Sequence, residues 1–398
     1  MLLLWWLLIS GQCLLLIIFW QGARTRILET KQPGQQCMPP LREGMRPDPT
    51  PNVAMVIPAA GQRPYMRRAL RSLMVQDYPH MVTIMVTESL NDPAVDLIHE
   101  LQKDFPHLRH VVAGPAEGCG QKNWNLLQAI KDIHDTADIY VFCDSTHYAQ
   151  PDFVRQLILP ILQQEAAFTT GYHAVDVQDH QVVSLGYQLS VLLMRFLQAS
   201  SAFTQPWGGA MAISRQAFLR HDIAGFWSDK VVDDCSLASY LMEKKSASVQ
   251  LCPHAVLRTP ARNHPLHVWQ AWMNRQVLFL KFCIPQQWML LGVFALLLSL
   301  PLLGSAIVLT GIWCGLLSKW FYGPLITHVV LLVGILWGWR ECLPRPVPMV
   351  PWFTAFVLSM YLFLRVYVGT IRAKGILWNN IDYRVAKGGK VLSITPRK

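Results

Sequence analysis

Apolar side chains follow two different patterns along the chain. Between about residues 52 and 285, short apolar runs alternate with amphipathic stretches, whereas outside that region the apolar runs are long. These long runs are Leu2–Trp20, Trp288–Leu317, Trp320–Trp339 and Val350–Val368. A helix of about 20 apolar residues spans the roughly 30 Å of hydrocarbon in a bilayer. We therefore expect membrane helices at both ends and a globular unit between them.

The central region predicts strands and helices in alternation. We expect strands over Val53–Pro58, Val82–Thr87, His110–Ala113 and Ile139–Cys143, and helices over Tyr65–Gln76, Ala94–Phe105 and Lys122–His134. Such alternation predicts an α/β fold with a doubly wound, mostly parallel sheet that binds ligands at the carboxyl ends of its strands. From about residue 150 to 285 the spacing is less regular, and we expect mixed α/β structure to continue there.

The first 23 residues carry no charged side chain, and Arg24, Arg26 and Lys31 follow them directly. A cleaved signal peptide is the competing interpretation, but the charge before its apolar run and a small-residue cleavage site are missing. We predict an uncleaved anchor over residues 1–23 and a Pro-, Gly- and Gln-rich linker over residues 24–51. By the positive-inside rule, the basic residues hold the following domain, residues 52–285, in the cytoplasm.

A second membrane region is expected over residues 286–371. The run Trp288–Leu317 is interrupted at Pro301, so it predicts either one tilted span or a tight hairpin. The tail, residues 372–398, carries seven Lys and Arg side chains, which favour the cytoplasmic side. An even number of crossings after residue 285 follows, which supports the hairpin or an interfacial helix.

The overall composition agrees with a multi-pass membrane protein. Hydrophobic residues make up 52% of the chain and charged residues 15%, against about 25% charged in soluble domains. This excludes a disordered chain and a wholly soluble enzyme. The net charge of +10 comes largely from residues beside the apolar runs, so anionic lipid is the expected partner rather than nucleic acid.

Acidic residues follow two of the predicted strands. Glu88 and Asp92 come after Val82–Thr87, and Asp144 comes directly after Ile139–Cys143. Asp92 precedes a proline and so also fits a helix cap, and Asp144 also fits a turn. An acid at the end of a buried strand is costly unless it is paired or bound to a metal, which leaves a functional interpretation open for Asp144.

A pair of adjacent acids, Asp233 and Asp234, opens a helix expected over Ser236–Lys244. Acids at a helix start are ordinarily stabilising, and for an isolated pair that interpretation is sufficient. Two adjacent carboxylates also repel each other, which raises one pKa and suits that group to proton abstraction.

Taken in order along the chain, these motifs resemble those of inverting, membrane-bound family 2 glycosyltransferases, and most closely the ceramide glucosyltransferases and their bacterial relatives. The resemblance covers about residues 50–285 and extends to the tail. The matching stretches are Val56-Ile-Pro58-Ala59, Gln76-Asp-Tyr-Pro79, Asn91-Asp92-Pro-Ala94, Gly120-Gln-Lys122-Asn-Trp-Asn125, Cys143-Asp144-Ser145, Gly208-Gly-Ala-Met-Ala-Ile213, Asp233-Asp234, Arg275 and Trp378-Asn-Asn-Ile-Asp-Tyr383.

The resemblance implies a GT-A-like fold and a UDP-sugar donor bound at the strand ends. Its binding residues would be Pro58 and Ala59 at the uracil and ribose, Glu88 and Asp92 at the nucleotide, and Lys122 at the diphosphate. Asp144 would hold a divalent cation, Mg²⁺ or Mn²⁺, that bridges the diphosphate. The second acid of an Asp-x-Asp motif is replaced by Thr146. His147 or His254 could assist, although a structural or surface role is the more common one for each.

The resemblance also implies the reaction. Asp234, beside Asp233, would act as the general base that takes a proton from an acceptor hydroxyl, and Arg275 would contact phosphate. The expected function is transfer of a hexose from the UDP-sugar to a hydroxyl of a membrane lipid, ceramide-like or otherwise long-chained, at a bacterial inner membrane or an ER or Golgi membrane.

Two residues depart from the family pattern around Arg275. The usual motif is Gln or Arg, two variable residues and Arg-Trp, and this chain has Trp272 and Gln276 at its ends. A catalytically silent homologue that serves as a membrane scaffold is therefore an alternative. A polysaccharide synthase is another, but it needs a channel and more spans. Trp269 and Trp272 fit either an aromatic wall of the acceptor site or a helix resting at the membrane interface.

Overall fold

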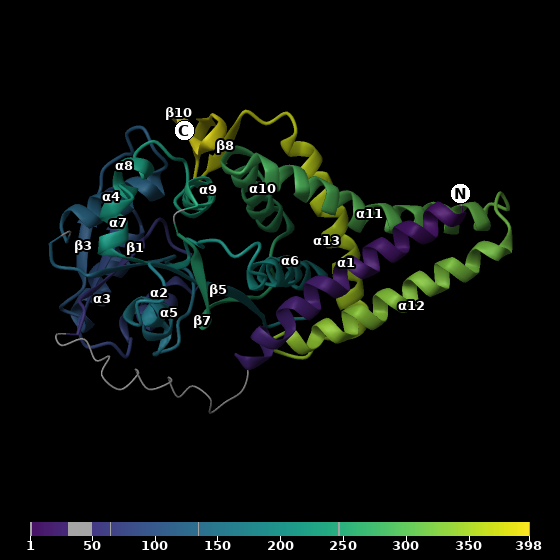
Figure 1. Cartoon of the computed structure of the whole chain (residues 1–398), viewed down its shortest axis with the longest axis horizontal. Helices are drawn as coiled ribbons and strands as arrows, with labels where there is room; N and C mark the ends of the chain where they lie inside the picture. Colours follow the sequence, from purple (N-terminus) through teal and green to yellow (C-terminus); the bar gives the residue numbers. More distant parts are fainter. Residues whose placement is uncertain (1, 31–49, 64, 134, 246, 398) are drawn as a thin grey trace.

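The structure is a computed structural model that describes residues 2–30, 50–63, 65–133, 135–245 and 247–397. It consists of an α/β unit from which long helices extend (Figure 1). Most of the expected linker lies outside the described residues. Its first part, however, is helical, because α1 (Leu2–Glu29) continues six residues beyond the expected end of the anchor.

The α/β unit contains one seven-stranded sheet in the order β3-β2-β1-β4-β6-β5-β7. Its strands are β1 (Val53–Pro58), β2 (Met81–Thr87), β3 (Arg109–Val112), β4 (Ile139–Cys143), β5 (Phe168–Val177), β6 (Ala210–Ser214) and β7 (Val249–Ala261). Strands β3, β2, β1 and β4 are parallel, and so are β5 and β7, while β6 runs antiparallel to both of its neighbours. The expectation of a mostly parallel sheet is confirmed.

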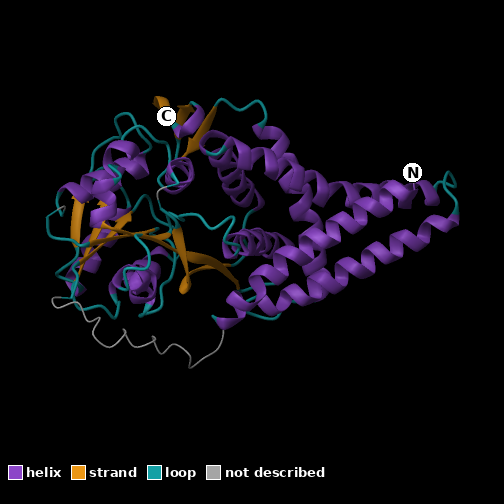
Figure 2. Cartoon of the chain, in the orientation of Figure 1, coloured by secondary structure: helices purple, strands orange, loops and turns teal. Residues whose placement is uncertain are grey.

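Helices cover both faces of this sheet (Figures 1 and 2). In β1, Met55 and Ile57 face one core, whereas Ala54 and Val56 face another. The first core is shared with α2 (Met66–Met74), α3 (Ala94–Asp104) and α5 (Phe153–Leu162), and the second with α4 (Gln121–Lys131), α7 (Arg215–Arg220), α8 (Ile223–Trp227) and α9 (Asp234–Lys244). A strand buried on both faces has no polar alternation, which explains the short continuous apolar run in the sequence. The doubly wound arrangement is confirmed.

The helix boundaries lie close to those expected from periodicity. The helices of this unit are α2 (Met66–Met74), α3 (Ala94–Asp104), α4 (Gln121–Lys131), α5 (Phe153–Leu162), α6 (Val182–Ala199), α7 (Arg215–Arg220), α8 (Ile223–Trp227), α9 (Asp234–Lys244) and α10 (Leu266–Cys283). Helix α9 begins at Asp234, two residues before the expected Ser236, so Asp233 is its N-cap and Asp234 its first residue.

The membrane region contains α11 (Pro285–Trp313), α12 (Tyr322–Trp339) and α13 (Met349–Thr370). The described residues include five helices long and apolar enough to cross a membrane, namely α1, α6, α11, α13 and the segment Lys319–Cys342 that contains α12. Figure 1 shows α1, α11 and α12 side by side, extending away from the α/β unit, and α13 crossing near their base. Both ends of α13 lie at that base, because the indole of Trp352 donates to Leu336 and that of Trp288 donates to Thr370.

The hairpin alternative for Trp288–Leu317 is wrong, because α11 is one continuous helix with Pro301 inside it. A proline removes a single backbone hydrogen bond, and apolar residues continue on both sides, so the helix persists. The chain turns instead at Gly315, whose φ of +73° is a conformation that glycine adopts readily. Helices α11 and α12 therefore form the antiparallel pair.

The basic tail folds back onto the α/β unit as a three-stranded sheet of β8 (Gly375–Trp378), β9 (Ile381–Val385) and β10 (Val391–Pro396). Ile376 and Tyr383 pack against Val232 and Cys235 near α9 and against Phe282 of α10. The loop before β10 continues this contact, since Val231 N donates to Gly389 O over 2.9 Å. The tail therefore lies on the same side of the membrane helices as the sheet (Figure 1).

Candidate active site

Three of the expected site residues meet at one point of the structure. The Lys122 ammonium, on the first turn of α4, lies 3.0 Å from Asp144 Oδ1 and 3.1 Å from Asp233 Oδ2, and it donates to Gly208 O over 3.0 Å. Asp144 follows β4, and Asp233 precedes α9. The carboxyl end of a central strand and the starts of two helices thus form one acid–lysine cluster.

Glycines allow the backbone to come this close. A Cβ added to Gly120 would lie 2.1 Å from the carbonyl oxygen of Val231, which holds the start of α4 against the segment before α9. A Cβ added to Gly208 would lie 2.3 Å from Asp233 Oδ2 and 2.6 Å from Lys122 Nζ. Both positions exclude larger side chains because backbone or an ion pair occupies the space.

The two adjacent acids have different surroundings. Asp233 is fully buried, and within the described part of the chain neither of its oxygens accepts a hydrogen bond, so the ion pair with Lys122 balances its charge. Asp234 accepts hydrogen bonds from Gly208 N at 2.8 Å and from its neighbour Cys235 N at 2.5 Å. Burial, and then repulsion from Asp233, raise the pKa of Asp234 to about 6. A carboxylate with such a pKa is suited to taking up a proton near neutral pH.

Asp144 and Lys122 are held in their charged forms. Burial would raise the pKa of Asp144, but the Lys122 ammonium and the His147 ring outweigh it and hold that pKa well below its usual range. Burial likewise opposes the charge of Lys122, yet the surrounding carboxylates raise its pKa. The Asp144 side chain remains 36% exposed, so an ionised carboxylate faces open space.

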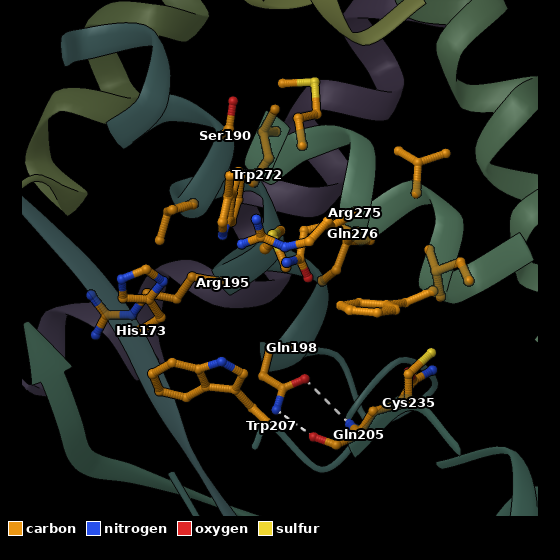
Figure 3. Close-up of a pocket in the computed structure, with 18 of the residues that line it drawn as sticks. His173, Ser190, Arg195, Gln198, Gln205, Trp207, Cys235, Trp272, Arg275 and Gln276 are labelled. Atoms are coloured by element: carbon orange, nitrogen blue, oxygen red, sulfur yellow. Dashed lines mark hydrogen bonds between the residues drawn. The ribbon is translucent and has the colours of Figure 1, made fainter. Parts of the chain in front are cut away.

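That space is a cavity of about 530 Å³. Lys122, Asp144, Asp233 and Asp234 line one part of it, and Arg275 lines it from α10. In Figure 3, Arg275 and Gln276 point into this cavity below Trp272, and Trp207 and His173 lie on the opposite side. Apolar side chains of the long helices line another part, including Phe19 of α1, Leu298 of α11 and Phe363 of α13. The cavity therefore joins the acid–lysine cluster to the membrane helices.

The two tryptophans of α10, Trp269 and Trp272, have different surroundings. Trp272 lines the cavity and meets the Tyr187 ring edge-on, with 5.2 Å between ring centroids. Trp269 is fully buried, and its indole donates to Ser190 over 3.1 Å. Trp272 is therefore the one in a position to contact a ligand, and Trp269 packs α10 onto α6.

The remaining expected site residues lie at the ends of β1 and β2. Asp92 Oδ1 accepts from Ala94 N and from Gly61 N, both at 2.8 Å, so it joins the start of α3 to the loop after β1. The N-cap position of α3 is held by Pro93, so Asp92 lies one residue before the cap. Burial, followed by the nearby Asp92, raises the pKa of Glu88.

Pro58 and Ala59 end β1 beside these acids, where Ala59 N donates to Val86 O. The described residues that line the cavity do not include Pro58, Ala59, Glu88 or Asp92. The structure therefore groups the expected residues into two sets, one at the carboxyl ends of β1 and β2 and one around Lys122.

Sequence reasoning did not find several polar residues of the cavity. His173 on β5 and Trp207 before β6 stack with ring centroids 5.2 Å apart, and Arg195 reaches the cavity from α6. No motif marks these residues, because β5, β6 and α6 come together only through the sheet order. The tail, by contrast, was marked by its Trp378-to-Tyr383 motif. Tyr383 lies next to the site, because its hydroxyl accepts a hydrogen bond from Gln121 N beside Lys122.

A parallel β3-β2-β1-β4 sheet with acids at its carboxyl edge and an antiparallel β6 define a GT-A-like glycosyltransferase fold. The chain belongs to glycosyl transferase family 21, whose model matches residues 3–391. The resemblance to ceramide glucosyltransferase-like enzymes is thereby confirmed. A comparison with curated proteins gives no match.

A solved mannosyltransferase structure shows the same fold. A mannosyltransferase, PcManGT from Pyrobaculum calidifontis in complex with GDP-mannose and Mn²⁺, is 15% identical with a TM-score of 0.54, covering 91% of this chain and 98% of that chain. Glucosyl-3-phosphoglycerate synthase from Mycobacterium tuberculosis, in complex with Mn²⁺, UDP and glucosyl-3-phosphoglycerate, is 17% identical with a TM-score of 0.36, covering 58% of this chain and 78% of that chain. The first similarity extends over the membrane helices as well as the α/β unit.

Proposed function

We propose that this protein is an inverting glycosyltransferase that moves a hexose from a UDP-sugar to a hydroxyl of a membrane lipid, ceramide-like or otherwise long-chained. The observation that carries the proposal is the cavity shared by Asp234 and apolar side chains of α1, α11 and α13. A lipid whose chains lie among these helices would present its head-group hydroxyl to the base. A water-soluble acceptor would have no need of this apolar wall.

The donor would bind across the carboxyl edge of the sheet. Pro58, Ala59, Glu88 and Asp92 surround the ends of β1 and β2 and would hold the nucleotide. Lys122 lines the cavity and would meet the diphosphate with its ammonium group. Arg275, which also lines the cavity, can form a paired contact with phosphate oxygens.

The residues present fit a divalent cation. Asp144 presents an ionised, partly exposed oxygen ligand to the cavity, and hard cations such as Mg²⁺ and Mn²⁺ prefer oxygen ligands. The similar mannosyltransferase was solved with Mn²⁺ and a nucleotide sugar. When bound, the cation would supply positive charge to the diphosphate of the departing UDP.

Asp234 would act on the acceptor. Its carboxylate takes the proton of the lipid hydroxyl while the hydroxyl oxygen forms a bond to the anomeric carbon. The bond from that carbon to the diphosphate oxygen breaks on the opposite face, so the anomeric configuration inverts. Asp233 keeps Lys122 in place and, through repulsion, keeps the pKa of Asp234 high enough for proton uptake.

The α/β unit would face the cytoplasm, where UDP-sugars are made. Arg24 and Arg26 end α1 on the side of the sheet, and the basic tail folds onto the same unit. Both features agree with the positive-inside rule for a domain on the cytoplasmic side.

The test is a screen of UDP-sugars against lipid alcohols with purified protein in lipid nanodiscs, with UDP release measured and products identified by mass spectrometry. We expect UDP release that depends on added lipid and a product carrying one hexose. Release of UDP without lipid dependence, or repeated addition of sugars, would contradict a lipid acceptor and favour a polysaccharide synthase. UDP-sugar binding without transfer to any lipid would support the catalytically silent alternative.

A further inference from the structure

His147 and Asp144 face each other across a short gap at the edge of the cavity. His147 Nε2 lies 3.6 Å from Asp144 Oδ2, and both residues line the cavity. This separation is too long for an ordinary N–H···O hydrogen bond. Two ligands that each lie about 2.1 Å from one ion are about 3 Å apart at a right angle and about 4 Å apart on opposite sides, so the observed separation lies within the range of a pair that shares a cation.

The other side of the imidazole ring is fixed. His147 Nδ1 lies 2.6 Å from the hydroxyl oxygen of Thr259, and His173 Nε2 lies 2.8 Å from the same oxygen. A hydroxyl has one proton, so it can donate to one of these nitrogens while it accepts from the other. With Nδ1–H of His147 donating to Thr259, the lone pair of His147 Nε2 points toward Asp144. Metal-binding histidines commonly donate their second N–H to an oxygen in this way.

The neighbouring contacts leave this gap open for a cation. Lys122 pairs with the other carboxylate oxygen of Asp144, Oδ1, at 3.0 Å. The Trp207 ring packs beside His147, with 5.5 Å between ring centroids, and stacks on His173, so the imidazole is held on its face as well. The His147 side chain is 10% exposed, and the cavity accounts for its open side.

We propose that His147 Nε2 is the second protein ligand of the divalent cation, together with Asp144 Oδ2. This inference rests on the proposed nucleotide-sugar site, where diphosphate oxygens and water would complete the coordination. Thr146 stands where an Asp-x-Asp motif has its second acid, and His147 supplies the missing ligand from the next position. Imidazole suits transition metals, whereas Mg²⁺ takes oxygen ligands, so the site prefers Mn²⁺ to Mg²⁺.

The experiment is pulsed electron paramagnetic resonance of Mn²⁺ bound to the full-length protein with UDP, which detects a directly coordinated ¹⁴N nucleus. We expect a ¹⁴N coupling in the parent protein and in His254→Asn, the matched control, because His254 is exposed and is not among the described residues that line the cavity. The coupling disappears in His147→Asn. In His147→Asp, which restores an oxygen ligand, the coupling is also lost and the affinity ratio of Mn²⁺ to Mg²⁺ falls.

A second variant distinguishes a His147 that coordinates the cation from a His147 that only orients Asp144. Thr259→Val removes the partner of Nδ1 but leaves the imidazole, so the ¹⁴N coupling persists while Mn²⁺ affinity falls by about 10–100-fold. Mn²⁺ that binds the parent with UDP but shows no ¹⁴N coupling, or a coupling that survives in His147→Asn, overturns the inference and leaves the proposed function intact. A parent protein that binds neither UDP nor Mn²⁺ contradicts the proposed function itself.

Discussion

Asp233 and Asp234 are adjacent in sequence, yet their side chains have different surroundings in the structure. Asp233 is buried against Lys122, whereas Asp234 accepts two backbone hydrogen bonds and lines the cavity with a raised pKa. Replacement by asparagine removes the charge of either residue while it keeps an oxygen that can accept hydrogen bonds. The pair therefore offers a matched comparison between the proposed base, Asp234, and the residue that supports its surroundings, Asp233.

We expect Asp234→Asn to lower kcat by about 10²–10⁴-fold, the usual contribution of a general base, and to leave UDP-sugar affinity within a few-fold of the parent. Turnover is measured with the lipid acceptor, and binding by calorimetry. Asp233→Asn is the control: it removes one of the two carboxylates that pair with Lys122, so it should change donor affinity and thermal stability as well. Near-normal turnover in Asp234→Asn with turnover lost in Asp233→Asn would assign the base to the other acid.

The raised pKa of Asp234 predicts the pH dependence of the reaction. Burial and the charge of Asp233 raise this pKa to about 6, although Lys122 partly opposes them. A base acts only when it is ionised, so kcat/KM should be level above about pH 6 and fall about tenfold per pH unit below it. The residual activity of Asp234→Asn should lack this acidic limb. A limb unchanged in that variant would belong to another group.

Asp144→Ala should weaken both UDP affinity and its response to a divalent cation. The Asp144 carboxylate is held ionised and partly exposed, so its removal takes a negatively charged oxygen ligand away from the expected cation position. Titration of UDP at several Mg²⁺ and Mn²⁺ concentrations measures the effect. The same metal dependence in Asp144→Ala and in the parent would remove this carboxylate from the cation site.

At the scale of elements, the start of α4 is positioned by a close backbone approach. Gly120 N donates to Lys230 O over 2.9 Å, and an added Cβ would collide with Val231. Gly120→Ala should therefore shift the first turn of α4, move Lys122 away from its two acids and lower activity strongly. Gly22→Ala is the control, since a Cβ there meets nothing within 4 Å. Enzyme activity and melting temperature are measured for both variants. Full activity in Gly120→Ala would show that the backbone at this contact can move apart without displacing Lys122.

Elements with a strong local pattern could be predicted from the sequence, and elements defined by tertiary order could not. Strand β4 has the expected bounds because all five of its residues are buried and apolar, and the acid after it marks its carboxyl end. The antiparallel direction of β6 is set by its partners β4 and β5, which lie far from it in sequence. For the same reason His173 was missed, since only the pairing of β5 with β7 brings it to Thr259.

At the scale of the whole molecule, the long helices and the tail make the membrane arrangement testable. The turn after α11 lies at the end of the molecule away from the α/β unit, and its Cys314 is exposed. Thr395, in β10, is exposed on the opposite side of the long helices. A cysteine at each position should therefore react from opposite sides of a sealed vesicle.

We expect Thr395→Cys, in a Cys37→Ser and Cys314→Ser background, to react with an impermeant maleimide only from the cytoplasmic side. Cys314 alone, in Cys37→Ser, should react only from the other side. Inverted and right-side-out vesicles provide the two conditions. Reaction of both cysteines from the cytoplasmic side would mean that α11 and α12 do not cross the bilayer as a pair. Reaction of both from the other side would mean an odd number of crossings after residue 285.

The folded tail has a consequence for how the enzyme is made. Gly389 O and the hydroxyl of Tyr383 accept hydrogen bonds from Val231 N and Gln121 N, on either side of the acid–lysine cluster. These contacts belong to residues that follow α11, α12 and α13 in the chain. The active site is therefore completed only after the helices that line its cavity have been synthesised. A ribosome stalled before β8 would hold a chain that has Asp144, Asp233 and Asp234 but no finished active site, so a nascent chain would not consume its nucleotide-sugar donor before its membrane helices are made.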